Sequence, residues 1–318
     1  MNLDEQIHPD LRQALAESEP FFQFSDIAEK RIWADSVIED YEIPEFIDVF
    51  NVFVPGPAGA PDVRVRVYRE KNPKEPQPGL MWLHGGGYVF RKPENEELQC
   101  IDIVRETKCI VVSVDYRSAP ENPYPAALED CYAALVWMEK GGMQYNIDPS
   151  RLAVAGQSAG GGLTAALSLL ARDRKGPNIL FQIPIYPMID DRNATWSTRE
   201  MLDLRAWNGE ASISCWNAYL SGLNRNEDVP AYAAPARATD YSGLPPTYIY
   251  VGQLEPFVEE AMQYASDLNR AGIPVELHIY PSCIHGFDVV APDSPIGRRA
   301  VNELMHVIRD GFARSGTW

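Results

Sequence analysis

Short apolar runs alternate with longer amphipathic stretches along most of the chain, and this alternation is its clearest structural signal. The apolar runs predict eight strands, at residues 49–54, 63–68, 79–83, 109–114, 151–155, 180–185, 247–251 and 275–280. Helical periodicity predicts five helices, at residues 95–107, 126–140, 159–172, 256–271 and 296–313. Strands that alternate with helices are typical of an α/β fold with a mostly parallel sheet and helices on both faces.

Two segments do not fit this alternation. Residues 1–45 and 188–232 are instead rich in aromatic side chains, namely Phe21, Phe22, Phe24, Trp33, Trp196, Trp207 and Trp216. We hypothesise that they pack together as a helical cap above the strand ends; the alternative is that they form ordinary surface helices. The expected division is then 1–45 as the N-terminal part of the cap, 46–187 as core, 188–232 as the cap insertion and 233–318 as the C-terminal part of the core.

Composition limits the class of protein and its partners. The chain has 318 residues, of which 45% are hydrophobic and 23% charged, and this favours one large α/β domain with a smaller appendage. It contains no apolar stretch long enough to span a bilayer, and its polar, acidic first residues do not resemble a signal peptide, so we expect a cytoplasmic protein. The net charge of −17 argues against nucleic acid or an anionic membrane as a partner, and it predicts weak repulsion of carboxylate-bearing substrates unless charges at the pocket override it.

The five cysteines do not indicate a metal or redox site. Cys100, Cys109, Cys131, Cys215 and Cys283 are scattered without the spacing of metal ligands, and we interpret them as buried free thiols. Cys283 lies close to His285, but a thiol at a strand end is more often a packing residue than a nucleophile. We therefore expect no metal site.

Two glycine-rich motifs carry the candidate chemistry. The first is the run His84-Gly85-Gly86-Gly87, which follows the predicted strand at 79–83. The second is Gly156-Gln157-Ser158-Ala159-Gly160, which lies between a predicted strand and a predicted helix. A G-x-S-x-G motif in that context is a nucleophile elbow, in which a sharp turn projects a serine above the sheet edge. Each run alone is compatible with a plain tight turn, but together they describe an acyl-transfer site.

A serine nucleophile needs a base, and in hydrolases of this type the base follows the serine and an acidic residue in chain order. Three histidines follow Ser158: His278 falls in a predicted strand, His306 in a predicted helix and His285 in the loop 282–286. Only the loop position allows an imidazole to swing over the sheet edge, so we assign His285 as the base. A base must be neutral, so activity should fall at acidic pH.

The orienting acid is expected at the end of the strand before this histidine. Glu255 lies there, in a turn before a helix predicted to begin with Pro256. Glu259 and Glu260 come one turn later, where carboxylates commonly interact with the helix dipole, and Asp288 comes after the histidine. These positions favour Glu255.

The same motifs predict an oxyanion hole. The negative charge that forms on the ester oxygen needs backbone N–H donors, which we assign to Gly86, Gly87 and Ala159. Glycine suits the first two positions because the backbone must approach the substrate without a Cβ between them.

These motifs resemble the hormone-sensitive lipase family of α/β-hydrolases, in its bacterial esterase branch, over nearly the whole chain. Residues 115–121, read with 125–127, look like the family's Y-R-L-A-P-E stretch, and 181–187 look like its sixth strand. The resemblance implies a cap, hydrolysis of short-acyl esters, no cofactor, and homodimers paired through the last strand of the sheet. Two residues depart from the family pattern, because Gln157 and Glu255 stand where the family usually has Asp.

Substrate size and reaction type are less clear in the sequence. Tyr88, Phe90 and Tyr186 flank the motifs, and as pocket walls they would limit the acyl group to acetyl through hexanoyl, although such aromatics are equally typical of core packing. The same machinery serves an amide hydrolase, such as an arylacetamide or formamide deacylase. A non-catalytic ligand-binding protein is a further alternative, disfavoured because members of the family with that role lose the histidine that is present here as His285.

Overall fold

A computed structural model describes residues 2–18, 27–38, 42–223 and 229–314. The aromatic residues Phe21, Phe22 and Phe24, part of the predicted cap, lie outside the described residues. In the described part of the chain, no helix combines the length and the apolar character needed to cross a membrane.

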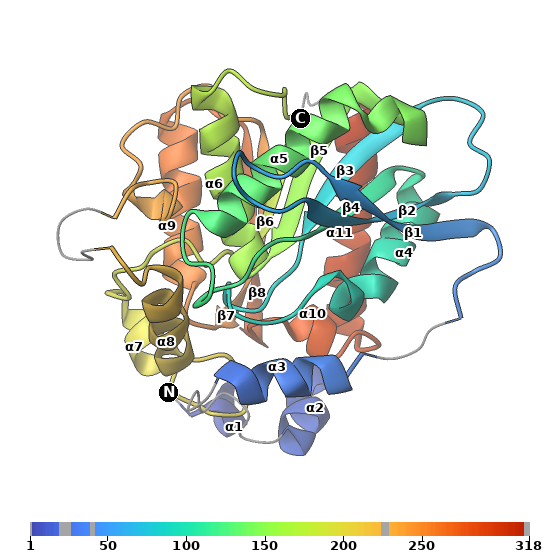
Figure 1. The fold of residues 1–318 in the computed structure, drawn as a ribbon. Helices are drawn as coiled ribbons and strands as arrows, with labels where there is room; N and C mark the ends of the chain where they lie inside the picture. The colour runs from blue at the N-terminus through green and yellow to red at the C-terminus, as the bar shows by residue number, and fades with distance from the viewer. Residues whose placement is uncertain (1, 19–26, 39–41, 224–228, 315–318) are drawn as a thin grey trace.

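The centre of the fold is one eight-stranded sheet (Figure 1). Its strands are β1 (Ile47–Val54), β2 (Val63–Glu70), β3 (Gln77–Leu83), β4 (Ile110–Asp115), β5 (Ile147–Gln157), β6 (Gln182–Ile185), β7 (Thr247–Leu254) and β8 (Val275–Ile284). They lie in the order β1-β2-β4-β3-β5-β6-β7-β8; β2 is antiparallel to both neighbours and all other pairs are parallel. The predicted mostly parallel sheet of eight strands is therefore confirmed.

One strand boundary matters for the site. The sequence predicts that the last strand ends at residue 280, but β8 continues to Ile284. The reason is that its pairing with β7 resumes after an irregularity next to Gly252, so that Leu254 pairs with Ile284. His285 therefore follows the strand directly and does not lie in the middle of a loop.

Helices cover both faces of this sheet (Figure 1). The helices are α1 (Leu3–Gln6), α2 (Arg12–Glu17), α3 (Ile27–Ser36), α4 (Glu97–Thr107), α5 (Ala126–Lys140), α6 (Ala159–Asp173), α7 (Trp196–Glu200), α8 (Gly209–Tyr219), α9 (Val258–Arg270), α10 (Phe287–Val290) and α11 (Pro295–Ala313). Short 3₁₀ turns lie at Pro9–Leu11, Pro93–Glu96, Gly142–Tyr145 and Pro235–Arg237. All five predicted helices are present. Two begin later than predicted: α4 follows a 3₁₀ turn, and Pro256 stays in the turn before α9, where its carbonyl oxygen accepts hydrogen bonds from Ser197 and Thr198.

The core lies between the sheet and these helices. Helices α5 and α6 contact one another, as do α4 and α11, and α9 packs against β7 and β8. In β3 the side chains from Leu80 to Leu83 are all buried, as expected for a central strand covered on both faces. In β2 the valines are buried while Arg64 and Arg66 reach carboxylates, so this strand is half-buried as its alternating sequence predicts.

The two aromatic-rich segments lie at one end of the molecule, where α1, α2 and α3 neighbour α7 and α8 (Figure 1). Arg205, between α7 and α8, donates a hydrogen bond of 3.0 Å to Asp4 in α1. Helix α3 is fixed to the loop after β3, because the Arg31 guanidinium donates to the Val89 carbonyl at 2.8 Å. Trp33 of α3 and Trp207 line a cavity at this end.

Candidate active site

Ser158 occupies the turn between β5 and α6. Its backbone has φ 55° and ψ −115°, a strained conformation for a residue other than glycine. The turn is held by hydrogen bonds from Ser158 N–H to the Ile185 carbonyl at 2.9 Å and from Met188 N–H to the Ser158 carbonyl at 3.0 Å. Gly160 is required for close packing, because a Cβ there would lie 1.9 Å from the Leu83 carbonyl oxygen. The sequence thus fixes the serine in a nucleophile elbow.

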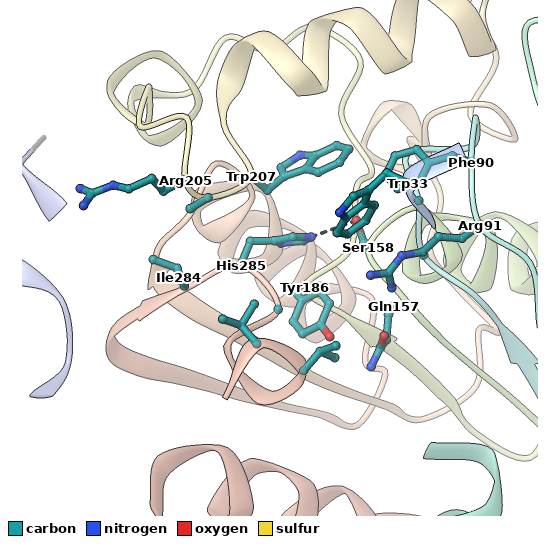
Figure 2. Close-up of a pocket in the computed structure, with 16 residues that line it drawn as sticks. Trp33, Phe90, Arg91, Gln157, Ser158, Tyr186, Arg205, Trp207, Ile284 and His285 are labelled. Carbon is teal, nitrogen blue, oxygen red and sulfur yellow. Dashed lines mark hydrogen bonds between the residues drawn. The ribbon is translucent and has the colours of Figure 1, made fainter. Parts of the chain in front are cut away.

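His285 contacts Ser158 from the end of β8. The imidazole Nε2 lies 3.0 Å from Ser158 Oγ, and Figure 2 shows the ring directed at the serine. The other ring nitrogen, Nδ1, is hydrogen-bonded to Glu255 Oε2. The rings of Tyr186 and Phe257 pack edge-on against the imidazole, with centroid distances of 4.7 and 5.2 Å. These contacts hold the ring between the hydroxyl and the carboxylate.

Glu255 is fully buried at the end of β7. Its second oxygen, Oε1, accepts a hydrogen bond of 3.0 Å from Gly252 N–H. Burial raises the pKa of Glu255 above its usual value, and the neighbouring His285 opposes this effect. The structure therefore brings together Ser158, His285 and Glu255, the three residues assigned from the sequence.

The other acidic candidates are engaged elsewhere. Glu259 accepts a hydrogen bond from Ser197 N–H at 2.7 Å, and Glu260 accepts one from Asp190 N–H at 3.1 Å. Asp288 accepts from the Tyr250 hydroxyl at 2.7 Å, and burial raises the pKa of this carboxyl.

The other two histidines also lie away from the serine turn. His278 sits in β8 between Glu276 and Glu303, and His306 in α11 is hydrogen-bonded to the Asn302 carbonyl. Their places in a strand and a helix agree with the sequence analysis.

The glycine loop after β3 lies beside the serine turn, since a Cβ on Gly85 would lie 3.6 Å from Ser158 Cβ. Gly86 and Gly87 have φ values of 109° and 59°, and a Cβ on Gly86 would lie 2.0 Å from the Phe90 carbonyl oxygen. Neither N–H donates a hydrogen bond to another residue in the described part of the chain. Ala159 is the first residue of α6, so its N–H has no partner within the helix. None of the three N–H groups predicted to form the oxyanion hole is thus engaged within the described part of the chain.

Sequence analysis did not identify Glu96, which fixes this loop. The side chain is buried; Oε1 accepts from Gly85 N–H at 2.8 Å and Oε2 from the Trp82 indole at 2.6 Å. The sequence shows three glutamates among residues 94–97, but it does not indicate which of their side chains is buried. His84 is buried beside the loop and stacks on Tyr116 at 4.1 Å, so it is a packing residue.

A small cavity of about 110 Å³ opens onto the serine and the histidine (Figure 2). Its walls are mainly apolar and include Trp33, Phe90, Tyr186, Trp207, Ile284, Val289 and Val290. Two of the predicted wall residues, Phe90 and Tyr186, are among them. Tyr88 is not: its ring stacks on Tyr219 at 4.0 Å and its hydroxyl donates to the Met188 carbonyl, so it belongs to the core behind the cavity.

No group of His, Cys, Asp and Glu side chains in the described ranges is arranged to hold a metal ion. All five cysteines are buried free thiols, as predicted. Burial raises the pKa of Cys283 to about 12, which keeps this thiol protonated and unreactive.

The sheet order, the serine turn between β5 and α6 and the histidine after β8 define a protein of the α/β-hydrolase class. Comparison with known proteins agrees, because a family model described as "alpha/beta hydrolase fold" matches residues 80–289. The chain belongs to this family, in its hormone-sensitive lipase-like branch.

Several proteins similar to this chain carry esterase names. Esterase LipI of Mycobacterium tuberculosis is 35% identical over 82% of this chain and 81% of its own length. Carboxylesterase NlhH of the same species is 36% identical over 72% of each chain. Among solved structures, one titled "Bacterial Heroin Esterase" superposes with a TM-score of 0.93 at 36% identity, covering 98% of this chain and 99% of that one. Esterase LipW of Mycobacterium marinum gives 0.88 at 36% identity, over 97% and 96%.

Proposed function

We propose that this carboxylic ester hydrolase cleaves short-chain acyl esters through Ser158, His285 and Glu255, with an acyl-enzyme intermediate. The observation that carries the proposal is the continuous hydrogen-bonded chain from Ser158 Oγ through both imidazole nitrogens to the buried Glu255 carboxyl. The esterase names of its relatives support the reaction class.

In the first half of the reaction, Ser158 Oγ attacks the ester carbonyl carbon while its proton passes to His285 Nε2. The N–H groups of Gly86, Gly87 and Ala159 stabilise the oxyanion of the tetrahedral intermediate. The bond from carbon to the alcohol oxygen then breaks, and the departing oxygen takes the proton from His285. The alcohol leaves, and the acyl group remains on Ser158.

In the second half, a water molecule takes the place of the alcohol. It gives a proton to His285 as its oxygen attacks the acyl carbon, and the same backbone donors stabilise the second oxyanion. The bond from carbon to Ser158 Oγ then breaks, and the serine recovers its proton from His285. The products are a carboxylic acid and the free enzyme.

Glu255 fixes the tautomer and the orientation of the imidazole. Its carboxylate accepts a hydrogen bond from Nδ1–H, which keeps the ring proton on Nδ1 and leaves Nε2 unprotonated and directed at Ser158. When His285 becomes positively charged in the reaction, the buried carboxylate stabilises that charge, and an ion pair replaces an isolated buried anion.

The small volume of the cavity supports a preference for short acyl chains. A volume of about 110 Å³ is below the roughly 150 Å³ of an engineered cavity that holds benzene, which favours a short acyl group over a long one. Phe90 and Tyr186 form part of its wall, and Trp33 and Trp207 close it from the two aromatic-rich segments, which we propose act as a cap.

A series of p-nitrophenyl esters from acetyl to palmitoyl tests this function. We expect the highest kcat/KM between acetyl and hexanoyl, and loss of turnover in Ser158→Ala. Faster turnover of the palmitoyl than of the butyryl ester would contradict the size limit. Matched amides in parallel separate ester from amide hydrolysis, because only the leaving group differs.

We also propose a homodimer formed through the last strand. Strand β8 is at the edge of the sheet, and Ile279 in it is 39% exposed. Sedimentation velocity of the wild type and of Ile279→Lys tests this: a dimer that becomes monomeric in the variant supports it, and a wild-type monomer contradicts it.

A further inference from the structure

Arg91 is the one residue of the cavity wall that combines a charged side chain with a strained backbone. It directly follows Phe90, at the end of the glycine loop, and its φ is 72°. This left-handed conformation favours glycine, and for an arginine it costs stability. The surrounding turn imposes it, because the N–H groups of Val89 and Phe90 both donate to the Gly86 carbonyl. Strain of this kind is concentrated at functional sites.

The guanidinium of Arg91 has no hydrogen-bond partner within the described part of the chain. It forms an ion pair with Glu96, but the shortest separation, to Glu96 Oε1, is 3.6 Å, which is beyond hydrogen-bond distance. Both oxygens of Glu96 are already used by Trp82 and Gly85. The Arg91 side chain is nevertheless only 22% exposed, so most of it is shielded from water.

Arg205, the second arginine on the cavity wall, differs from Arg91 because its guanidinium is hydrogen-bonded within the protein. The Arg205 guanidinium donates to Asp203 at 2.8 and 3.0 Å and to Asp4 at 3.0 Å. Its charge and its donors are therefore used within the protein. Arg91 is the wall arginine whose planar donor group remains available to a ligand.

The position of Arg91 indicates which part of a substrate it meets. Figure 2 shows Arg91 and His285 on opposite sides of Ser158. The leaving alcohol must lie beside His285 Nε2, which gives it a proton. The acyl group, on the other side of the scissile bond, therefore extends toward Arg91.

We propose that Arg91 binds a carboxylate at the far end of the acyl group, so that the preferred substrates are monoesters of short dicarboxylic acids. This inference rests on the proposed ester hydrolysis at Ser158. The whole chain has a net charge of −17 and repels anions at long range. Inside the cavity the guanidinium acts at short range, because the apolar walls reduce solvent screening around it and its ion-pair partner Glu96 has both oxygens hydrogen-bonded to Trp82 and Gly85.

Isosteric ester pairs test the preference. Ethyl hydrogen succinate and ethyl isocaproate share the alcohol and the shape of the acyl group and differ in its terminal charge. Acetoxyacetate and isobutyl acetate form the corresponding pair with the charge on the alcohol side. For each pair the ratio of kcat/KM, charged over neutral, is measured in the wild type and in variants; this ratio cancels any general loss of activity.

We expect the succinate ratio to fall by about ten- to a hundredfold in Arg91→Gly and in Arg91→Met, as for loss of a charged hydrogen bond. The glycine variant also relieves the strained φ, whereas the methionine variant keeps a long side chain, so agreement between them assigns the effect to the charge. Arg91→Lys should give an intermediate ratio. The matched control Arg205→Met should leave the ratio unchanged, since the donors of that guanidinium are already hydrogen-bonded to Asp203 and Asp4.

Binding to the Ser158→Ala variant tests the same inference without turnover. The fluorescence of Trp33 and Trp207 in the cavity wall reports ligand occupancy. We expect ethyl hydrogen succinate to bind at least about tenfold more tightly to Ser158→Ala than to Ser158→Ala with Arg91→Gly. Equal binding, or an unchanged succinate ratio in the Arg91 variants, overturns the inference.

The inference is also overturned if the Arg91 variants change only the ratio for the acetoxyacetate pair, because Arg91 would then bind a charge on the alcohol side of the ester. Failure of the underlying function looks different: the wild type would hydrolyse neither ethyl ester, while binding to Ser158→Ala would still report on Arg91.

Discussion

Replacing Glu255 with glutamine removes one hydrogen-bond acceptor and leaves the shape of the side chain almost unchanged. In the wild type, Oε1 accepts a hydrogen bond of 3.0 Å from Gly252 N–H, and Oε2 accepts a hydrogen bond from Nδ1–H of His285. In Glu255→Gln, the amide oxygen satisfies Gly252 and the amide nitrogen then faces Nδ1. Two donors cannot share that contact, so the imidazole keeps its proton on Nε2, the nitrogen that must accept the proton of Ser158.

The magnitude follows from this change of tautomer. The corresponding exchange of aspartate for asparagine in a serine protease triad lowers kcat by about ten-thousandfold while the geometry stays intact. We expect a loss of about a thousand- to ten-thousandfold here, which corresponds to about 4–5.5 kcal/mol of transition-state stabilisation. The KM should change little, because Glu255 is fully buried and does not line the cavity.

The assay is kcat for p-nitrophenyl butyrate, with the melting temperature of each variant measured to exclude unfolding. Glu259→Gln is the matched control, because Glu259 lies in the same region but accepts from Ser197 N–H and not from His285. We expect it to keep kcat within about twofold of the wild type. If folded Glu255→Gln retains more than about a tenth of the wild-type kcat, the assignment of Glu255 as the orienting acid is wrong.

Three further predictions concern stability and the cavity. Burial and the charge of Asp190 raise the pKa of Glu260 well above its usual value, so the folded protein keeps a proton that the unfolded chain loses above about pH 4.3. The free energy of unfolding should therefore fall as pH rises from about 4.3 toward the raised pKa of Glu260. Glutamine carries no such proton, so calorimetry should show the melting temperature of Glu260→Gln rising relative to that of the wild type as pH increases. Gly160→Ala, whose Cβ would lie 1.9 Å from the Leu83 carbonyl oxygen, should lose about 2–3 kcal/mol or more in denaturant unfolding; unchanged unfolding would refute the close packing. Phe90→Ala should shift the p-nitrophenyl ester with the highest kcat/KM to a longer acyl chain, because Phe90 lines the cavity. Tyr88→Phe should not, because Tyr88 lies outside the cavity wall.

The sequence was sufficient to predict the sheet and the three residues at its edge. Central strands such as β3 are continuous apolar runs because both faces are covered, and such runs are recognisable without a structure. Ser158 lies in a motif whose turn is fixed by local sterics, and chain order restricted the search for its partners. Among the three histidines after Ser158, His285 was chosen because His278 and His306 fall within a predicted strand and a predicted helix.

The residues that surround these three could not be predicted in the same way, because their roles depend on contacts between distant segments. Glu96 supports the glycine loop only because a 3₁₀ turn brings it under Gly85. Tyr88 directly follows that loop in sequence, yet its ring turns away and stacks on Tyr219 of α8. The sequence did not point to Arg91, since neither its positive φ nor the lack of a hydrogen bond to its guanidinium can be derived from a local pattern.

Covalent labelling of Ser158 by a fluorophosphonate tests the central claim most directly, because the reagent reacts with an activated serine and needs no knowledge of the natural ester. Intact mass and peptide mapping should show one phosphonyl group on Ser158 in the wild type, none in Ser158→Ala, and a greatly slowed reaction in His285→Ala. A folded wild-type protein that hydrolyses esters but remains unlabelled at Ser158, or a Ser158→Ala variant that is labelled as fast as the wild type, would contradict the account.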